Sequence, residues 1–287
     1  MNALYKLIQG TPEWHEHRAK YRNASETAAV MGVSPWLTSY GLWCVKTGRT
    51  VVEETEAMRY GTSTEPAARA AFEQESGLVM QPLVMVDGDY SASLDGITLL
   101  GDTIVEIKCP YRGQTSELWQ MVKADVVPQN YLLQVQHQLM VSGAKTAYLW
   151  VYDGQQGVGI SIEPNLETFA QIKTAWEAFQ LYIDHDTPPP LTEQDTVTRY
   201  DAEWQQAAEA YLTSKAVSDE AEATLAEAKA KLISLTSHSR ESGFGISVTK
   251  YWKQGNVDYK KVPQLQNVDL ELYRGKMREE VRVTIAS

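Results

Sequence analysis

An aspartate and an acid–x–lysine string give this chain the residue types of a metal-assisted site. Asp95 precedes a glycine, and eleven positions later Glu106 and Lys108 flank a single isoleucine. Residues two apart on a strand point to one face of a sheet, so Glu106 and Lys108 would project side by side if residues 103–108 form a strand. A preceding hairpin would return Asp95 beside them. Two carboxylates suit Mg²⁺ or Mn²⁺, and a neighbouring lysine can position or activate a water molecule on the metal.

The same string also fits a surface hairpin with an ion pair across one face, since acid–x–lysine is a common pattern. Zinc chemistry has little support. His15 and His17 lie in the string Trp-His-Glu-His, but no HExxH motif and no cysteine pair accompany them. We therefore expect no zinc, and we predict that the two histidines face solvent from a helix.

Length and composition bound the class of protein. The 287 residues are 43% apolar and 22% charged, as in ordinary soluble proteins, and they can form one full core and a smaller second one. No apolar run approaches the ~18–20 residues of a membrane span, and the first ten residues lack the form of a signal peptide. Two cysteines imply no disulfide framework and fit a reducing cytoplasm.

Charge is unevenly distributed along the chain. The net charge of −11 argues against a protein that coats nucleic acid with its whole surface. Residues 1–52 nevertheless contain six basic and three acidic residues, whereas residues 53–187 hold an acidic surplus. A phosphate-binding patch near the start and metal-binding acids further on would produce this distribution, and so would plain fluctuation in composition.

The candidate residues lie in a chain that alternates helical and strand patterns. Thr11 is placed to cap a helix that begins with Pro12, and Ser25 is placed to cap the next helix. Expected helices cover residues 12–20, 24–30, 39–47, 65–75, 131–140 and 167–184, and expected strands cover residues 79–86, 90–93, 97–100, 103–108 and 147–152. This order predicts an α/β (mixed α+β) fold with a central mixed sheet flanked by helices.

Three consecutive prolines divide the chain. They cannot continue a helix, and they separate an expected core, residues 1–187, from a C-terminal accessory module, residues 191–287. The module has a long helical pattern over residues 201–236. Its heptad seam consists of Ala221, Leu225, Ala228, Leu232 and Leu235. Strand-like alternation at residues 245–250 and 281–285 predicts a small sheet.

Six short motifs follow one another between residues 13 and 153. They are Trp14-His15-x-x-Arg18, Ala24-Ser25-Glu26, Gly61-x-x-x-Glu65 with Ala68-Arg69, Ser93-x-Asp95-Gly96, Glu106-x-Lys108-Cys109-Pro110 and Tyr131-x-x-Gln134-Val135-Gln136. In this order they resemble the motifs of the phage lambda exonuclease and YqaJ-type viral recombinase family, within the PD-(D/E)xK nuclease superfamily. Any one motif is weak, but the ordered set favours a nuclease.

The resemblance implies a restriction-endonuclease-like core and a Mg²⁺-dependent reaction, with Mn²⁺ as a substitute. The implied activity is 5′→3′ digestion of one strand of double-stranded DNA from an end, in phage-type recombination by single-strand annealing. The implied partners are DNA ends, a single-strand annealing protein and further copies of the chain in a ring-shaped homotrimer, with no membrane. The expected location is the cytoplasm of a bacterial host, with a phage or prophage gene as the source.

The resemblance also assigns roles at the expected metal site. Asp95 would bridge the metals, and Glu106 would bind one of them together with the carbonyl of Ile107. Glu65 would reach the second metal from its helix, although an acid there also suits the first turn of a helix. Lys108 would orient the attacking water and ease its deprotonation. Gln134 would steady that water or the lysine, although a glutamine there also suits a hydrogen bond in the core.

A second group of residues resembles the family's contacts to DNA. Arg18 matches the contact to the 5′-phosphate, for which a guanidinium fork is well suited. Ser25 and Ser93 would donate to the same phosphate, although Ser25 also suits an ordinary helix cap. Met58 takes the place of the family's apolar wedge between separating strands, and Trp14 that of a DNA contact. Both side chains also suit a core.

Three alternatives remain on the sequence alone. A metal-dependent endonuclease of the same superfamily would use the same metal site. A Cas4-like nuclease would bring four iron–sulfur cysteines, and this chain has two cysteines. A non-catalytic DNA-binding or interaction module would not require Glu65, Asp95, Glu106 and Lys108 together.

Overall fold

The computed structural model describes residues 3–5, 7, 11–256, 258, 261–265, 268 and 273–276. The chain divides into two compact units, Met1–Thr196 and Val197–Ser287. The first unit therefore includes residues 191–196, which the proline run had assigned to the accessory module. Asp195 accepts a hydrogen bond from the hydroxyl of Thr38, which ties this segment to the first unit.

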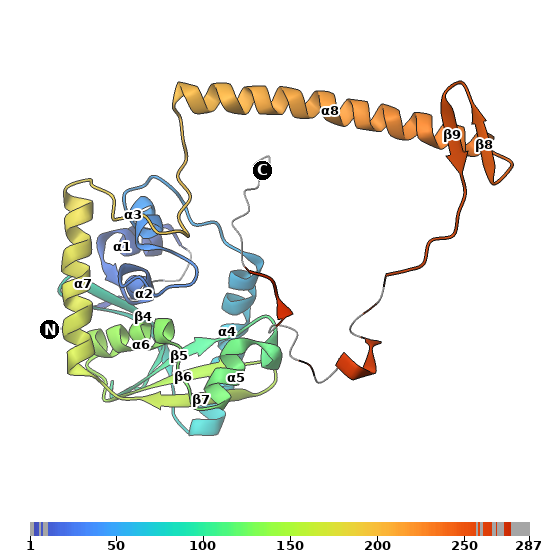
Figure 1. The fold of residues 1–287 in the computed structure, drawn as a ribbon. Coiled ribbons are helices and arrows are strands. Elements are labelled where there is room, and N and C mark those ends of the chain that lie inside the picture. The colour runs from blue at the N-terminus through green and yellow to red at the C-terminus, as the bar shows by residue number, and fades with distance from the viewer. Residues whose placement is uncertain are drawn as a thin grey trace. The chain divides into compact units, whose positions relative to one another are not determined.

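A seven-stranded mixed sheet forms the centre of the first unit (Figure 1). Its strands are β1 (Ala3–Tyr5), β2 (Arg22–Asn23), β3 (Gln81–Asp87), β4 (Tyr90–Ile97), β5 (Thr103–Lys108), β6 (Thr146–Tyr152) and β7 (Gly157–Ile162). The main path runs β1-β3-β4-β5-β6-β7, and β2 pairs with β4. β5 and β6 are parallel, as are β2 and β4, and the other pairs are antiparallel. The predicted mixed sheet is confirmed.

Helices cover both faces of this sheet. They are α1 (Pro12–Lys20), α2 (Thr27–Val30), α3 (Ser39–Lys46), α4 (Glu56–Ser76), α5 (Glu117–Lys123), α6 (Gln129–Ser142) and α7 (Leu166–Asp184). Buried residues of α5 and α6 pack with Leu149 and Val151 of β6. Trp150 and Tyr152 point to the other face, where they pack with Phe72 of α4. This alternation along β6 places the strand between two apolar layers. A third cluster joins α2, α3 and α7 to α6.

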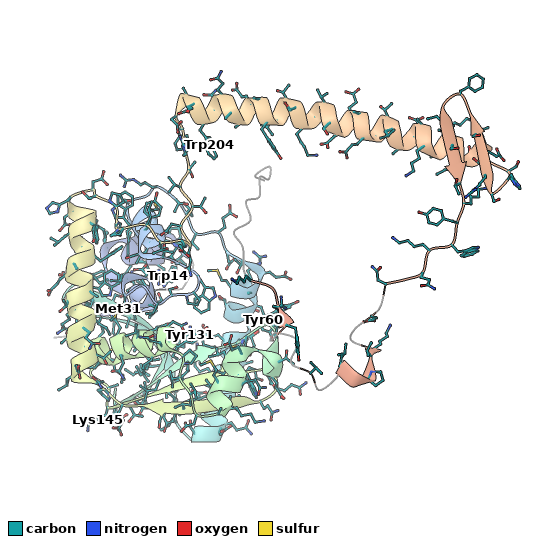
Figure 2. The ribbon with its side chains drawn as sticks, viewed as in Figure 1. Trp14, Met31, Tyr60, Tyr131, Lys145 and Trp204 are labelled. Atoms are coloured by element: carbon teal, nitrogen blue, oxygen red, sulfur yellow. The ribbon has the colours of Figure 1, made fainter. Side chains whose placement is uncertain are left out.

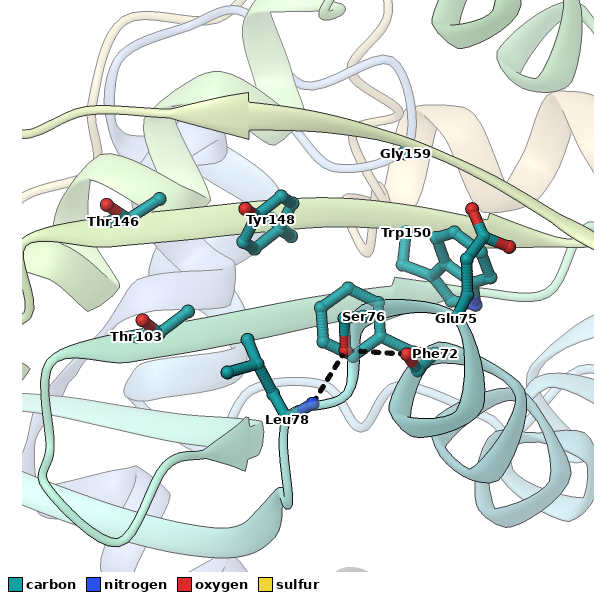
Figure 3. A pocket seen from close by; sticks show the side chains of 9 residues that line it. All are labelled: Phe72, Glu75, Ser76, Leu78, Thr103, Thr146, Tyr148, Trp150 and Gly159. Atoms are coloured by element: carbon teal, nitrogen blue, oxygen red, sulfur yellow. Dashed lines mark hydrogen bonds between the residues drawn. The ribbon is translucent and has the colours of Figure 1, made fainter.

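A cavity of about 470 Å³ lies between α4 and the sheet (Figure 3). Its lining includes Phe72, Thr103 and Trp150, so it adjoins the first residue of β5, at the end of the strand opposite Lys108. The indole of Trp150 covers Gly157 on β7, where a Cβ would come within 1.9 Å of the ring. Only glycine lets the indole lie flat on the edge strand.

Two elements near the candidate site, β4 and α4, have other bounds than predicted. β4 runs unbroken from Tyr90 to Ile97, where the sequence predicted two strands separated by a turn. Gly96 is a packing residue, since a Cβ there would lie 2.8 Å from atoms of Met80 and Val105. α4 begins at Glu56, and Pro66 lies inside it. The first turn is capped by Thr55, whose hydroxyl accepts from the N–H of Met58 at 3.2 Å.

The second unit contains a long helix and a hairpin. α8 covers Ala202–Leu235, with Asp201 as its N-cap, and no residue of this helix is buried. Leu225 and Leu235 of the predicted heptad seam are exposed. β8 (Arg240–Gly243) and β9 (Ile246–Thr249) pair antiparallel. The predicted strand at residues 281–285 lies outside the described residues. Among the helices that the structure describes, none is long and apolar enough to cross a membrane.

Candidate active site

β4 and β5 bring the acid–x–lysine string beside Asp95. The two strands pair antiparallel, and the backbone N–H of Ile107 donates to Asp95 Oδ2 at 2.7 Å. Lys108 Nζ lies 2.5 Å from Glu106 Oε1. Glu106 is buried, with 3% of its surface exposed, so its carboxylate must be hydrogen-bonded or paired within the protein. The structure thus gathers Asp95, Glu106 and Lys108 at neighbouring positions of two paired strands.

Two glutamines of α6 hold the carboxylate of Glu106. Gln134 Nε2 donates to Oε1 at 2.7 Å, and Gln138 Nε2 donates to Oε2 at 2.5 Å. Gln138 also donates to the carbonyl of Ser93 on β4 at 3.2 Å, and its side chain is fully buried. The sequence reasoning assigned Gln134 to the site but missed Gln138. The available signal was their spacing, because residues four apart share a helix face.

Glu65 reaches the site from the middle of α4. Arg69, one turn further along, places NH2 2.5 Å from Glu65 Oε1. The Nε of Arg69 donates to the carbonyl of Asp95 at 2.6 Å. Arg69 therefore links α4 to β4, a role that the sequence reasoning did not assign. Glu65, Asp95, Glu106 and Lys108 are called the acidic cluster below.

The acidic cluster contains three carboxyl groups and one lysine, so the pKa values of its groups depend on one another. Burial raises the pKa of Asp95 well above its usual range, and the carboxylates of Glu106 and Glu65 raise it further. Burial likewise raises the pKa of Glu65. At Lys108 burial favours the neutral amine, but Glu106 and Asp95 outweigh that effect and raise its pKa above the usual value. Lys108 is therefore a cation and a hydrogen-bond donor near neutral pH.

The residues of this cluster fit a divalent cation in their chemistry. They offer hard carboxylate oxygens, which Mg²⁺ and Mn²⁺ prefer, and a cation would relieve the repulsion that raises the pKa of Asp95. Across the described residues, no three histidine, cysteine, aspartate or glutamate side chains converge as a metal-binding group. Glu65 faces Arg69 and Glu106 faces Lys108 instead. A metal would therefore replace part of this internal pairing.

A second polar group surrounds Arg18 on α1. NH1 of Arg18 donates to Ser25 Oγ at 3.0 Å, and NH2 lies 2.9 Å from Glu26 Oε1. The guanidinium lies 4.7 Å from the ring centroid of Trp14, which is labelled in Figure 2. Lys46 Nζ lies 2.7 Å from Glu26 Oε2, with its side chain 6% exposed. The Glu26 carboxylate, held by Lys46, thus fixes the guanidinium from one side.

Ser25 does not cap a helix, which corrects one prediction. It lies inside the 3₁₀ helix η1 (Ala24–Glu26), and the caps of η1 and α2, Asn23 and Glu26, make no side-chain cap hydrogen bond. Asn23 Nδ2 instead donates to Glu26 Oε2 at 3.0 Å. Ser25 is exposed, so its hydroxyl is accessible beside Arg18.

His17 is buried, which corrects the prediction that both histidines face solvent. Its Nε2 lies 2.8 Å from Ser91 Oγ on β4, and burial lowers its pKa. This contact fixes α1 to the strand that carries Ser93 and Asp95. Ser93 is exposed on β4, two residues before Asp95 and therefore on the same face of the strand.

Met58 lies at the start of α4 with 48% of its surface exposed. The structure thus places it on the surface and not in the core. Trp14 is half-buried beneath Arg18. Tyr131 of α6, also labelled in Figure 2, lies with its ring centroid 5.3 Å from Lys108 Nζ.

Comparison with protein families places this unit among known domains. Residues 13–145 match the YqaJ-like viral recombinase domain. The protein YqaJ of Bacillus subtilis (strain 168) is 29% identical over 151 residues, which cover 50% of this chain and 46% of that protein. The chain thus spans about half the length of this curated relative.

Comparison with solved structures gives a likeness over a larger share of the chain. The alkaline exonuclease LHK-Exo from Laribacter hongkongensis is 25% identical, with a TM-score of 0.53 over 70% of this chain and all of that one. The structure of LHK-Exo in complex with dAMP is 26% identical, with a TM-score of 0.52 over 62% of this chain and 94% of that one. The expected restriction-endonuclease-like fold is confirmed.

Proposed function

We propose that this chain, whose residues 13–145 match the YqaJ-like viral recombinase domain, is a metal-dependent 5′→3′ exonuclease acting on ends of double-stranded DNA. Its role would be phage-type recombination by single-strand annealing. The observation that carries the proposal is the position of two polar groups along one strand. β4 carries Asp95 of the acidic cluster. Ser91 of the same strand contacts His17 of α1, the helix that carries Arg18. One group suits hydrolysis, and the other suits recognition of a terminal phosphate.

Mg²⁺ is the cofactor that we propose, with Mn²⁺ as a substitute. Asp95, Glu106, Glu65 and the carbonyl of Ile107 would hold it. When bound, the metal would polarise the scissile phosphodiester and lower the pKa of the attacking water. Lys108, a cation held at Glu106, would orient that water through its N–H groups. Gln134 would keep the Glu106 carboxylate in place for an in-line displacement of the 3′ oxygen.

Recognition of a 5′-phosphate is assigned to Arg18, Ser25 and Ser93. The guanidinium is already held by Glu26 on one side, so little side-chain entropy remains to be lost when a phosphate binds. Ser25 Oγ accepts from Arg18 and can donate its proton to a phosphate oxygen. Met58 is assigned to contact the end of the duplex from the exposed start of α4.

Replacement of Gln138 with leucine is expected to reduce the Mg²⁺-dependent rate by roughly 10- to 100-fold. Outer partners of metal-binding groups commonly contribute this much, and Gln138 is the donor to Glu106 Oε2. A Mg²⁺ titration of the rate should also show a higher metal requirement. Gln136→Leu is the matched control, because Gln136 is equally buried but donates to the carbonyl of Glu163. Equal losses in both variants would show that Gln138 supports only the core.

Removal of the second unit tests whether this unit is a docking module or an extension of the nuclease core. We expect a chain ending at Thr196 to keep digesting linear duplex as a homotrimer, and to lose retention of the annealing protein. Digestion, solution mass and pull-down of the partner measure these properties. The cut follows Thr196 because Asp195 contacts Thr38 in the first unit. An insoluble or inactive truncated chain would contradict this assignment.

An endonuclease with the same acidic cluster is the competing function. An endonuclease can cleave a closed circular duplex, whereas an exonuclease cannot, because the circle has no end. We expect Mg²⁺-dependent loss of the linear form and survival of the closed circle in one reaction mixture. Cleavage of the circle would support the endonuclease, and equal binding of DNA without any hydrolysis would support a non-catalytic module.

A further inference from the structure

The β8–β9 hairpin carries a polar, cationic face that the proposed hydrolysis does not use. Arg240 pairs with Thr249 and Ser242 pairs with Ser247 across the two strands, so these four side chains share one face. They line a groove of about 280 Å³. Glu241 also borders the groove, but its carboxylate accepts from the backbone of Ser237 and His238. A guanidinium and three hydroxyls therefore remain to meet a ligand.

The turn of this hairpin presents a strained aromatic residue. Phe244 has a φ of 49° and Gly245 a φ of 82°, both in the left-handed region. A two-residue turn of this kind prefers asparagine or glycine at its first position, and a bulky residue is strained there. The ring of Phe244 is fully exposed, so none of the described residues of this unit packs on it to offset the strain. Strain of this sort is a hint of function at the residue that carries it.

Two further aromatic residues follow β9 in the string Lys250-Tyr251-Trp252-Lys253. Tyr251 is 78% exposed and Trp252 is completely exposed. The string is attached to the end of α8, because Lys250 Nζ donates to the carbonyl of Thr236 at 2.9 Å. The backbone N–H of Lys250 also donates to the carbonyl of Ser239. Lys250 thus fixes the start of the string beside the hairpin, and the rings of Tyr251 and Trp252 are presented to solvent.

The net charge of this region is opposite in sign to that of α8. Residues 237–256 contain three basic residues and one acidic residue, whereas α8 contains three basic and six acidic residues. The basic residues of the segment are Arg240, Lys250 and Lys253. Basic residues interleaved with exposed aromatic rings form the typical surface for an unpaired nucleic acid strand. We call residues 240–253 the hairpin surface.

We propose that the hairpin surface binds single-stranded DNA, with the cationic groove on the phosphates and the rings of Phe244, Tyr251 and Trp252 stacked on unpaired bases. A duplex keeps its bases stacked inside, so it would leave these rings in water. The strand left unpaired by the proposed digestion would supply the ligand, and this statement alone rests on the proposed function.

The full chain in EDTA, with a fluorescent oligothymidylate of about 20 nucleotides, tests the proposal by anisotropy. The absence of metal separates binding from hydrolysis. The double variant Tyr251→Ala with Trp252→Ala is expected to bind at least about tenfold more weakly, since each stacked base contributes roughly a 5- to 150-fold effect. Trp252→Phe, which keeps a ring, should retain most of the affinity. Tyr200→Ala removes an equally exposed ring elsewhere in the unit and should have no effect.

Two further variants probe the turn and the charge. Phe244→Asn should weaken binding while raising the melting temperature, because asparagine suits the left-handed turn. Lys253→Gln should reduce the slope of log affinity against log salt by about 0.7. Unchanged binding in the Tyr251 and Trp252 double variant, or an equal loss in Tyr200→Ala, would overturn the proposal. A chain that binds the oligonucleotide through this surface but hydrolyses no DNA would retract the proposed function and leave this inference standing.

Discussion

Lys108→Ala is expected to reduce Mg²⁺-dependent hydrolysis of DNA by roughly 10³-fold or more, with the fold intact. Loss of a group that orients the attacking water removes several kcal/mol of stabilisation that exists only in the transition state, and each ~1.4 kcal/mol corresponds to a factor of ten. Asp95→Ala and Glu106→Ala should be at least as impaired, because each removes a proposed metal ligand. Initial rates on a linear duplex measure all three variants.

The effect of Mg²⁺ on the melting temperature distinguishes loss of a metal ligand from loss of Lys108. Mg²⁺ should raise the melting temperature of the wild-type chain and of Lys108→Ala, since a ligand that binds only the folded state stabilises it. The rise should vanish in Asp95→Ala and Glu106→Ala. Lys123→Ala removes an exposed lysine from α5 and serves as the control. Near-normal turnover in Lys108→Ala would show that the acidic cluster is an ion-pair network and not a catalytic site.

We expect the wild-type chain to prefer a 5′-phosphorylated end and Arg18→Ala to lose most of that preference. A hydrogen bond to a charged group contributes about 1.5–3 kcal/mol, which corresponds to roughly 10- to 150-fold in rate on phosphorylated ends. Activity on 5′-hydroxyl ends should change far less, because the contact is made only to the terminal phosphate. Paired digestion of two duplexes that differ only in this phosphate measures the ratio.

Arg22→Ala is the matched control for this experiment. Arg22 lies close by in the chain, but its NH1 donates to the hydroxyl of Tyr90. Glu26→Gln should give part of the Arg18→Ala effect, because it weakens the ion pair that fixes the guanidinium. Equal digestion of both ends by the wild-type chain would rule out a phosphate pocket at Arg18.

The sequence predicts best where local physics decides the structure. The Thr11 cap and Pro12 define the start of α1, and alternation along residues 103–108 defines β5. Because β5 was predicted correctly, Glu106 and Lys108 were expected on one face. β4 was predicted as two pieces because Asp95 and Gly96 are turn formers in isolation. In the fold, Gly96 supports close packing against Met80 and Val105, a contact that no local pattern reveals.

Long-range contacts account for what the sequence reasoning missed. Gln138 and Arg69 act on residues of β4 and β5 that are distant in the chain. The burial of His17 follows from its contact with Ser91, 74 residues away. The start of α4 was placed too late because Gly61 and Pro66 are read as helix breakers. Both lie inside the helix, which is capped by Thr55. The catalytic, metal-binding and DNA-binding roles assigned to all the site residues stay predictions.

The order of label release from a linear duplex tests the central claim most directly. Two preparations of the same duplex are compared. In one preparation a strand carries a label in its 5′-terminal nucleotide, and in the other preparation the same strand carries the label at its 3′ end. In Mg²⁺ we expect the 5′ label to appear first as a mononucleotide, the 3′ label to follow much later, and EDTA to stop both. Early release of the 3′ label, or release that continues in EDTA, would contradict a metal-dependent 5′→3′ exonuclease.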